Sequence, residues 1–513
     1  MIVAIRLKAR GTLREKYTTM KELLPLPLSV DQLIDLELQT EKKLLRPILS
    51  TRSLINNLRK KGHIVYISDM YLPDTFIRQQ LTDHGFFLPG DTLYVSDTIG
   101  AYKSDGSLFK YVRDKEHLSF SHWHHYGDNR HSDYRIPRRL GIKAHHLHYD
   151  YLPYEHQWIN NVVSTTYPYP SLMAGLSRAV RLSIPTIEDQ SRFVADISAP
   201  SITTWVASIM ADAKRRGISH LYFCARDCHS YYLAARSLAP AIGGIKVHYL
   251  FNSRRSLMPG TPYLIDYLVQ EGVASHSHKV ALVDTLSKGN ILRSVNRTLC
   301  QHGYPEVAMF YATNSTWSLQ EKEEQYLTTT PDQRLTDNLH SQYLFCGEHL
   351  SSIYCSPITA RLTFTRHYFE VLFSLNYHLQ TVGYAPRGNT IRPLLAKDPT
   401  ESWHFTGYTN RQTKNSNDRL IIAFAEGMQT LHLLPYSQQL LDRVAIPTFA
   451  HFLHQPPRPY LDYLHRFHKD GLVWVDKRWR KNIFWTHGSN VYTFSPTVLR
   501  LINAMRRLYA RLK

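Results

Sequence analysis

Four polar side chains in the first 150 residues could together bind and react with a phosphate group. Ser68, Lys103, Asp128 and Asp133 each stand in or just after a short run of β-branched and aromatic residues. Such runs predict buried parallel strands, and ligands of α/β sheets bind at the carboxyl ends of strands. A hydroxyl and a lysine can bind phosphoryl oxygens, and two carboxylates suit Mg²⁺. The four residues therefore predict a phosphate site with Mg²⁺ as its cofactor.

A second group of polar residues follows strand-like runs further along the chain. Asp284 ends one such run, where it could bind a metal or a ribose hydroxyl. Arginines can grip a diphosphate through paired hydrogen bonds, and the first N–H groups of a helix also suit a phosphate. The phosphate-binding candidates are Arg226, Arg254, Arg255, Ser287, Lys288 and Gly289. Together they fit a phosphorylated sugar with a diphosphate leaving group; the alternative is an ordinary helix start with surface arginines.

Four histidines close to Asp128 raise the alternative of a zinc site. In a strand, His122 and His124 would lie on one face and His125 on the other. His131 follows in the next loop. Because no further ligands stand at metal-binding spacing, we interpret these residues as ordinary core and rim histidines.

The composition is that of a folded, basic protein. The chain has 513 residues, 43% of them hydrophobic, and a formal net charge of +19. This charge favours phosphorylated, nucleic-acid or anionic-membrane partners, although a basic surface without a partner is the alternative. Five cysteines are too few for a disulfide framework. No window approaches the apolar length of a membrane span and no signal peptide is evident, so we expect a cytoplasmic protein.

The order of the expected elements indicates an α/β protein with two domains. Residues 1–150 are expected to form helices up to residue 62 and then alternating strands and helices, which is typical of a parallel sheet. Residues 151–195 contain several prolines and tyrosines without periodicity and are interpreted as a linker. Residues 196–513 are expected to form a second, larger α/β domain with a helical C-terminal part.

The first domain resembles the haloacid dehalogenase (HAD) superfamily. Ser68 resembles its second motif, Lys103 its third, and Gly127-Asp128-Asn129 with Asp133 its fourth. The resemblance implies a Rossmann-like phosphatase domain that binds Mg²⁺ through Asp128 and Asp133.

The first motif of that superfamily, a strand ending in Asp-x-Asp, is missing from this sequence. Asp31, Asp35 and Glu37 stand in a helical pattern instead, so residues 1–62 resemble remaining cap helices of a truncated domain. The resemblance then implies a neighbouring strand without its partner and a phosphatase that is inactive as written. The alternative is an active HAD phosphatase whose nucleophile lies upstream of a misassigned start.

Nearly the whole chain resembles the dual-domain ribofuranosyltransferases of bacterial surface-polysaccharide assembly, such as that of O-antigens. The resemblance implies that the C-terminal domain transfers phosphoribose from phosphoribosyl diphosphate to a lipid-linked glycan, and that the N-terminal domain removes the 5-phosphate. It suggests Asp227, Asp284 and Glu348 as catalytic acids or bases. Cys228 departs from the family, in which a glycine is expected after Arg-Asp.

The basic residues suggest two further kinds of partner, a membrane surface and RNA. Residues 497–513 place leucines and a methionine on one helical face and arginines elsewhere, so contact with an anionic membrane surface at the inner face of the membrane is a hypothesis beside ordinary core packing. The basic charge also permits RNA binding, but no RNA-binding motif is present and no nucleic acid is expected as a partner.

Overall fold

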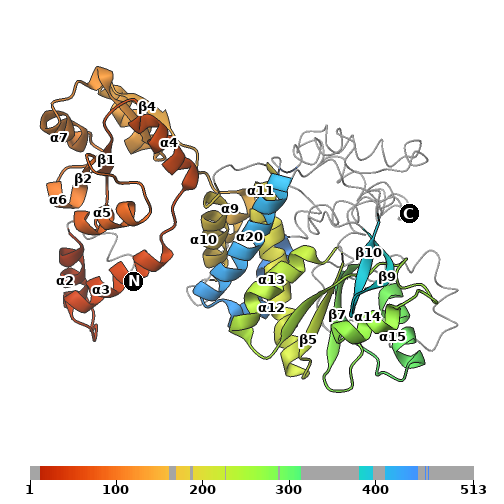
Figure 1. The fold of residues 1–513 in the computed structure, drawn as a ribbon. Helices are drawn as coiled ribbons and strands as arrows, with labels where there is room; N and C mark the ends of the chain where they lie inside the picture. Colours follow the sequence, from red (N-terminus) through yellow and green to blue (C-terminus); the bar gives the residue numbers. More distant parts are fainter. Residues whose placement is uncertain are drawn as a thin grey trace, which may run out of the picture. The chain divides into compact units, whose positions relative to one another are not determined.

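The computed structural model describes residues 12–160, 169–184, 189–225, 227–286, 289–313, 380–396 and 411–448, together with residues 457 and 460. The chain divides into two compact units. Unit 1 comprises Met1–Tyr151 and Leu182–Thr186, and unit 2 comprises Leu152–Arg181 and Ile187–Lys513. Both contain parallel strands connected by helices, so the predicted α/β class is confirmed (Figure 1).

Unit 1 begins with helices whose starts and breaks follow from the sequence. Reciprocal hydrogen bonds between Thr12 and Glu15 cap one helix, and Ser29 and Gln32 cap the next in the same way. Pro47 falls in the break that follows, since proline disfavours a helical residue before it. The helices are α2 (Leu13–Leu23), α3 (Val30–Leu44) and α4 (Leu49–Arg59).

The strands of unit 1 form two separate parallel pairs. β1 (Val65–Ser68) pairs with β2 (Thr92–Val95), and β3 (His124–Gly127) pairs with β4 (Lys143–His146). Among the described residues, β1 and β3 each have a partner on one side only.

Helices connect these strands as the sequence predicts, with differences at some ends. A 3₁₀ turn, Phe120–His122, precedes β3, and a π turn, Arg130–Arg135, precedes the last helix of this unit. The α-helices are α5 (Asp74–Asp83), α6 (Ser96–Ile99), α7 (Ser107–Lys115) and α8 (Ile136–Arg139).

The predicted linker over 151–195 is wrong in its described part, because these residues form packed helices of unit 2. Tyr154 and Trp158 lie four residues apart on one face of a helix and are buried. The side chain of Arg181 forms a buried ion pair with Glu155, with Nη2 and Oε2 2.8 Å apart. The helices are α9 (Pro153–Asn160), α10 (Tyr169–Leu182), α11 (Asp189–Phe193) and a π segment (Val194–Ser198).

Unit 2 is built on a four-stranded parallel sheet in the order β6-β5-β7-β8. The next two strands along the chain therefore lie on opposite sides of β5: β6 lies on one side and β7 on the other. Such a switch in strand order opens a crevice at the carboxyl ends of the two strands that flank it. The strands are β5 (His220–Cys224), β6 (Lys246–Leu250), β7 (Val280–Leu286) and β8 (Ala308–Thr313).

Helices of unit 2 follow the strands or pack beside them. They are α12 (Ala199–Arg215), α13 (His229–Ile242), α14 (Leu264–Glu271), α15 (Asn290–Gln301) and α20 (Arg411–Thr430), followed by short turns up to Ala445 that include α21 (Ser437–Leu440). An antiparallel hairpin, β9 (Thr381–Arg387) and β10 (Thr390–Leu395), was not predicted. The helices α12, α13 and α20 pack against one another (Figure 1).

Nearly all side chains of α12 are buried. The segment Ser191–Arg215 is long and apolar enough to cross a membrane, contrary to the sequence expectation. Its most apolar window is entirely buried inside the structure, which is the situation of a core helix.

Candidate functional site

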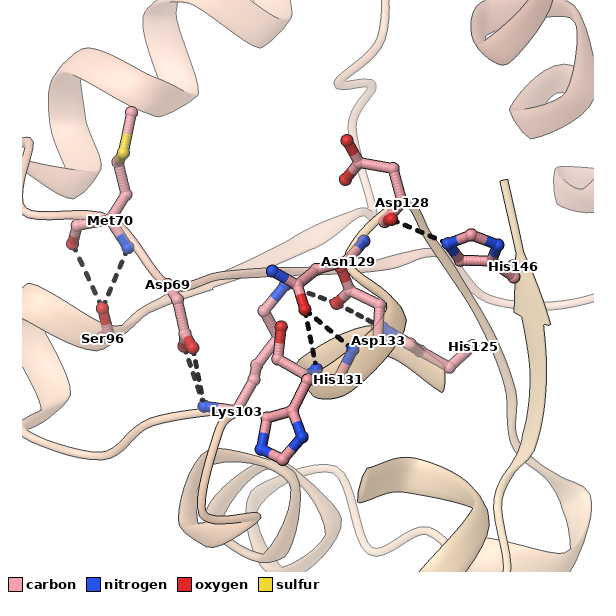
Figure 2. A network of polar contacts seen from close by, with 11 residues as sticks. Asp69, Met70, Ser96, Lys103, His125, Asp128, Asn129, His131, Asp133 and His146 are labelled. Carbon is pink, nitrogen blue, oxygen red and sulfur yellow. Dashed lines mark hydrogen bonds and ion pairs between the residues drawn. The ribbon is translucent and has the colours of Figure 1, made fainter. Parts of the chain in front are cut away.

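In unit 1, Lys103 connects the residues that follow β1 with those that follow β3. Its backbone N–H donates to both carboxylate oxygens of Asp69, at 2.8 and 3.1 Å, and its ammonium Nζ lies 2.6 Å from Oδ1 of Asp133 (Figure 2). Ser68, the last residue of β1, is half-buried beside Asp69. The structure thus brings together the segments of three of the predicted motifs.

Asp133 is the most firmly held carboxylate of this site. His125 Nε2 lies 3.0 Å from its Oδ1, and the Asn129 backbone N–H donates to its Oδ2 at 3.1 Å. Burial acts to raise its pKa, but the hydrogen bond from His125 and the charge of Lys103 outweigh it and lower the pKa of Asp133 to about 2. Asp133 is therefore an ionised partner of Lys103, and His125 is a core histidine, in agreement with the preferred interpretation.

Asp128 lies apart from this network. Its side chain is exposed and points away from Asp133, and its backbone carbonyl accepts a hydrogen bond from His146 Nε2 at 2.8 Å (Figure 2). In the described part of the chain no cluster of His, Cys, Asp and Glu has the arrangement of a metal site. The two carboxylates predicted to bind Mg²⁺ are therefore not brought together as a metal site.

In unit 2, acidic residues gather at the carboxyl ends of β5 and β7. Asp284 is 8% exposed and accepts a hydrogen bond from the Thr285 N–H at 2.7 Å. Asp227 is half-buried in the turn between β5 and α13. These two residues flank the point at which the strand order switches, where a ligand crevice is expected.

Cys228, the departure from the family pattern, has a structural role at this point. Its thiol donates to the backbone carbonyl of Val283 at 3.2 Å and so ties the start of α13 to β7. Burial, and then the nearby carboxylate of Asp284, raises the pKa of Cys228 well above its usual value. The side chain therefore remains a neutral thiol that donates a hydrogen bond.

The other predicted phosphate-binding residues are partly placed by the structure. Arg254 and Arg255 are exposed in the turn after β6, the strand next to β5. Gly289 is buried immediately before α15, with a φ of 68° that favours glycine. The remaining predictions, Arg226, Ser287, Lys288, Glu348 and the helix over 497–513, lie outside the described residues.

A pair of residues that the sequence did not single out also lies near this edge of the sheet. His229 opens α13, two residues after Asp227, and its Nε2 lies 3.6 Å from Oδ2 of Asp418 on α20. Further along the same two helices, Gln429 Nε2 donates to the Ser237 carbonyl at 2.9 Å, so the helices run in the same direction. No motif marks Asp418, because it is almost two hundred residues from its partner.

Neither a protein-family model nor a curated protein matches this sequence. The resemblance to HAD phosphatases and to ribofuranosyltransferases therefore rests on the sequence motifs alone.

Proposed function

We propose that unit 2 transfers a phosphoribosyl group from phosphoribosyl diphosphate to a glycan acceptor. One observation supports this most strongly: acidic and cation-bearing groups lie at neighbouring strand ends around the switch in strand order. They are the buried Asp284, the half-buried Asp227, the starts of α13 and α15, and the turn with two adjacent arginines. A sugar with a diphosphate leaving group needs both kinds of partner, cations for the phosphates and carboxylates for hydroxyls or protons.

Each group has a definite role in the proposed transfer. Arg254 and Arg255 bind the diphosphate and neutralise it as it leaves, and the starts of α13 and α15 direct N–H groups at anionic oxygens. The acceptor hydroxyl oxygen bonds to the anomeric carbon as the bond to the diphosphate oxygen breaks. Asp227 or Asp284 accepts the hydroxyl proton, and the diphosphate leaves with its charge neutralised by the two arginines.

A second candidate function is phosphate-ester hydrolysis by unit 1. The contacts of Lys103 with Asp69 and Asp133 favour it, because they bring an ammonium group and two carboxylates together after neighbouring strands. Asp133 is paired with Lys103 and Asp69 accepts the Lys103 N–H, so both carboxylates hold this lysine in place. The Asp-x-Asp motif that would supply the nucleophile is missing from the sequence. We propose that unit 1 is HAD-like and retains the phosphate-binding residues but not the hydrolysis.

The acceptor in this proposal is a lipid-linked glycan that is presented at the cytoplasmic face of a membrane. The basic net charge of +19 would favour an anionic membrane surface. Proteins of this charge bind many polyanions, so the donor is the better first test.

Calorimetric titration with phosphoribosyl diphosphate and Mg²⁺ tests the proposal. We expect micromolar binding by the wild-type chain and its loss in Asp284→Asn and Arg254→Ala. Arg236→Ala is the matched control, because it removes the same charge from an exposed position two turns into α13. Folded wild-type protein that fails to bind the donor, or equal losses in Arg254→Ala and Arg236→Ala, would overturn the proposal.

A further inference from the structure

The arginine-bearing turn after β6 is closed by the two serines that flank the arginines. The Ser256 N–H donates to Ser253 Oγ at 3.1 Å, and the Ser253 N–H donates to Ser256 Oγ at 2.9 Å. This reciprocal pair resembles a helix capping box, in which two side chains fix one turn of backbone. Arg254 and Arg255 occupy the two positions between them and are exposed.

The hairpin β9–β10, more than 120 residues away in the sequence, holds this turn in place by hydrogen bonds. The Ser253 hydroxyl donates to the carbonyl of Thr381 at 2.6 Å. Tyr384, which is 3% exposed, donates its hydroxyl to the Phe251 carbonyl at 3.0 Å and lies 3.2 Å from the Ser256 hydroxyl. Both ends of the turn are therefore hydrogen-bonded to β9.

The hairpin is in turn fixed to α14. The rings of Tyr384 and Tyr267 stack with centroids 4.4 Å apart, and the Tyr267 hydroxyl accepts the Phe251 N–H at 3.1 Å. At the other strand, Gln270 bonds both backbone groups of Ile391, at 2.6 and 3.0 Å. The hydroxyl of Tyr384 thus lies at the junction of α14, β9 and the turn.

We propose that Ser256 and Tyr384 are positioning residues that hold Arg254 and Arg255 in the geometry that binds a diphosphate. Two adjacent arginines repel each other, and ordering two long side chains costs conformational entropy. Among the described residues, neither guanidinium has an ion-pair partner that would hold it. A rigid turn lowers the cost of directing both charges at one anion. The identity of that anion as a donor diphosphate rests on the proposed function, whereas the role of the turn does not.

Titration with magnesium pyrophosphate tests this role directly, with phosphoribosyl diphosphate as a second ligand. We expect Ser256→Ala and Tyr384→Phe each to weaken binding of both ligands by roughly 2- to 10-fold, the effect of one lost hydrogen bond. Ser256→Thr, which keeps the hydroxyl, should restore binding. Gln270→Ala is the matched control, because it loosens the far strand of the hairpin without touching the turn.

A double-mutant cycle separates positioning from a general loss of stability. In a chain that already contains Arg254→Ala and Arg255→Ala, Tyr384→Phe should have no further effect on binding of either ligand. Additive losses, or equal losses in Tyr384→Phe and Gln270→Ala, would overturn the inference. If the wild type bound pyrophosphate but not phosphoribosyl diphosphate, and the variants lost this binding, the positioning role would be supported. Phosphoribosyl diphosphate would then be rejected as the donor. If the wild type bound neither ligand, both proposals would fall.

Discussion

Gly127 lies directly against the carboxyl group of Asp133. A methyl group on the Gly127 Cα would lie 2.4 Å from the Asp133 Cγ, closer than carbon atoms can approach without a shift. The glycine of the Gly-Asp-Asn motif is therefore explained by the space that the neighbouring aspartate occupies. Because Lys103 and His125 both bind Asp133, its position depends on the absence of a side chain at residue 127.

Gly127→Ala should consequently destabilise unit 1. Overpacking of this kind costs about 1–3 kcal/mol, and displacement of Asp133 also breaks its ion pair with Lys103. Urea unfolding monitored by circular dichroism measures the loss. Gly62→Ala is the control, because a methyl group there would have no heavy atom within 4 Å. Equal stability of the two variants would contradict the close contact.

The ion pair of Asp133 predicts a loss of stability in acid. Its folded-state pKa is lowered from 3.8 to about 2, so the folded state holds its proton less tightly than the unfolded state. The stabilisation is about 2 kcal/mol at neutral pH. It is present above pH 3.8 and is lost as the pH falls toward 2. The difference in unfolding free energy between wild type and Asp133→Asn, measured from pH 5 to pH 2, should shrink by about that amount. A constant difference would contradict the ionised pair.

Local sequence patterns predicted most of the elements that position these residues. The strands that contain Ser68 and Asp284, and the strand before Asp227, were recognisable because β-branched and aromatic runs end in polar turns. The linker over 151–195 was predicted wrongly because proline at a helix start looks the same in sequence as proline in a loop.

Contacts between distant segments could not be predicted in this way. Tyr384 reaches the turn after β6 from a hairpin that has no marked alternation of polar and apolar residues. Asp418 meets His229 only because α20 packs along α13. Such pairs depend on tertiary packing and leave no spacing signal in a single sequence.

Asp196, a buried acid in the helical part of unit 2, predicts a dependence of stability on pH opposite to that of Asp133. Asp196 is fully buried and accepts the N–H groups of Tyr154 and Glu155, and also the Tyr460 hydroxyl. Burial, only partly offset by the hydrogen bond from Tyr460, raises the pKa of Asp196 from 3.8 to about 7. The folded state therefore holds this proton more tightly than the unfolded state, and stability falls as the pH rises through this range.

Comparison with Asp196→Asn measures this effect. The unfolding free energy of the wild type, relative to that of the variant, should decrease by a few kcal/mol between about pH 4 and pH 7 and then remain level. Ser177→Ala, a buried polar change that leaves the Asp196 carboxyl group in place, should follow the wild-type pH profile. A relative stability that rises over this interval would show that Asp196 is ionised in the folded state.

The contact between His229 and Asp418 predicts that α20 contributes to donor binding without touching the donor. The pair fixes the first turn of α13, which follows Asp227, whereas Gln429 joins the same helices farther from the sheet edge. Asp418→Asn should lower stability by about 1 kcal/mol or less, since the pair is partly exposed. It should weaken binding of phosphoribosyl diphosphate by roughly 3- to 10-fold, whereas Gln429→Ala should change stability by a similar amount and binding hardly at all. Calorimetry and urea unfolding of the two variants provide both quantities, and equal effects on binding would mean that α20 acts only as a structural support.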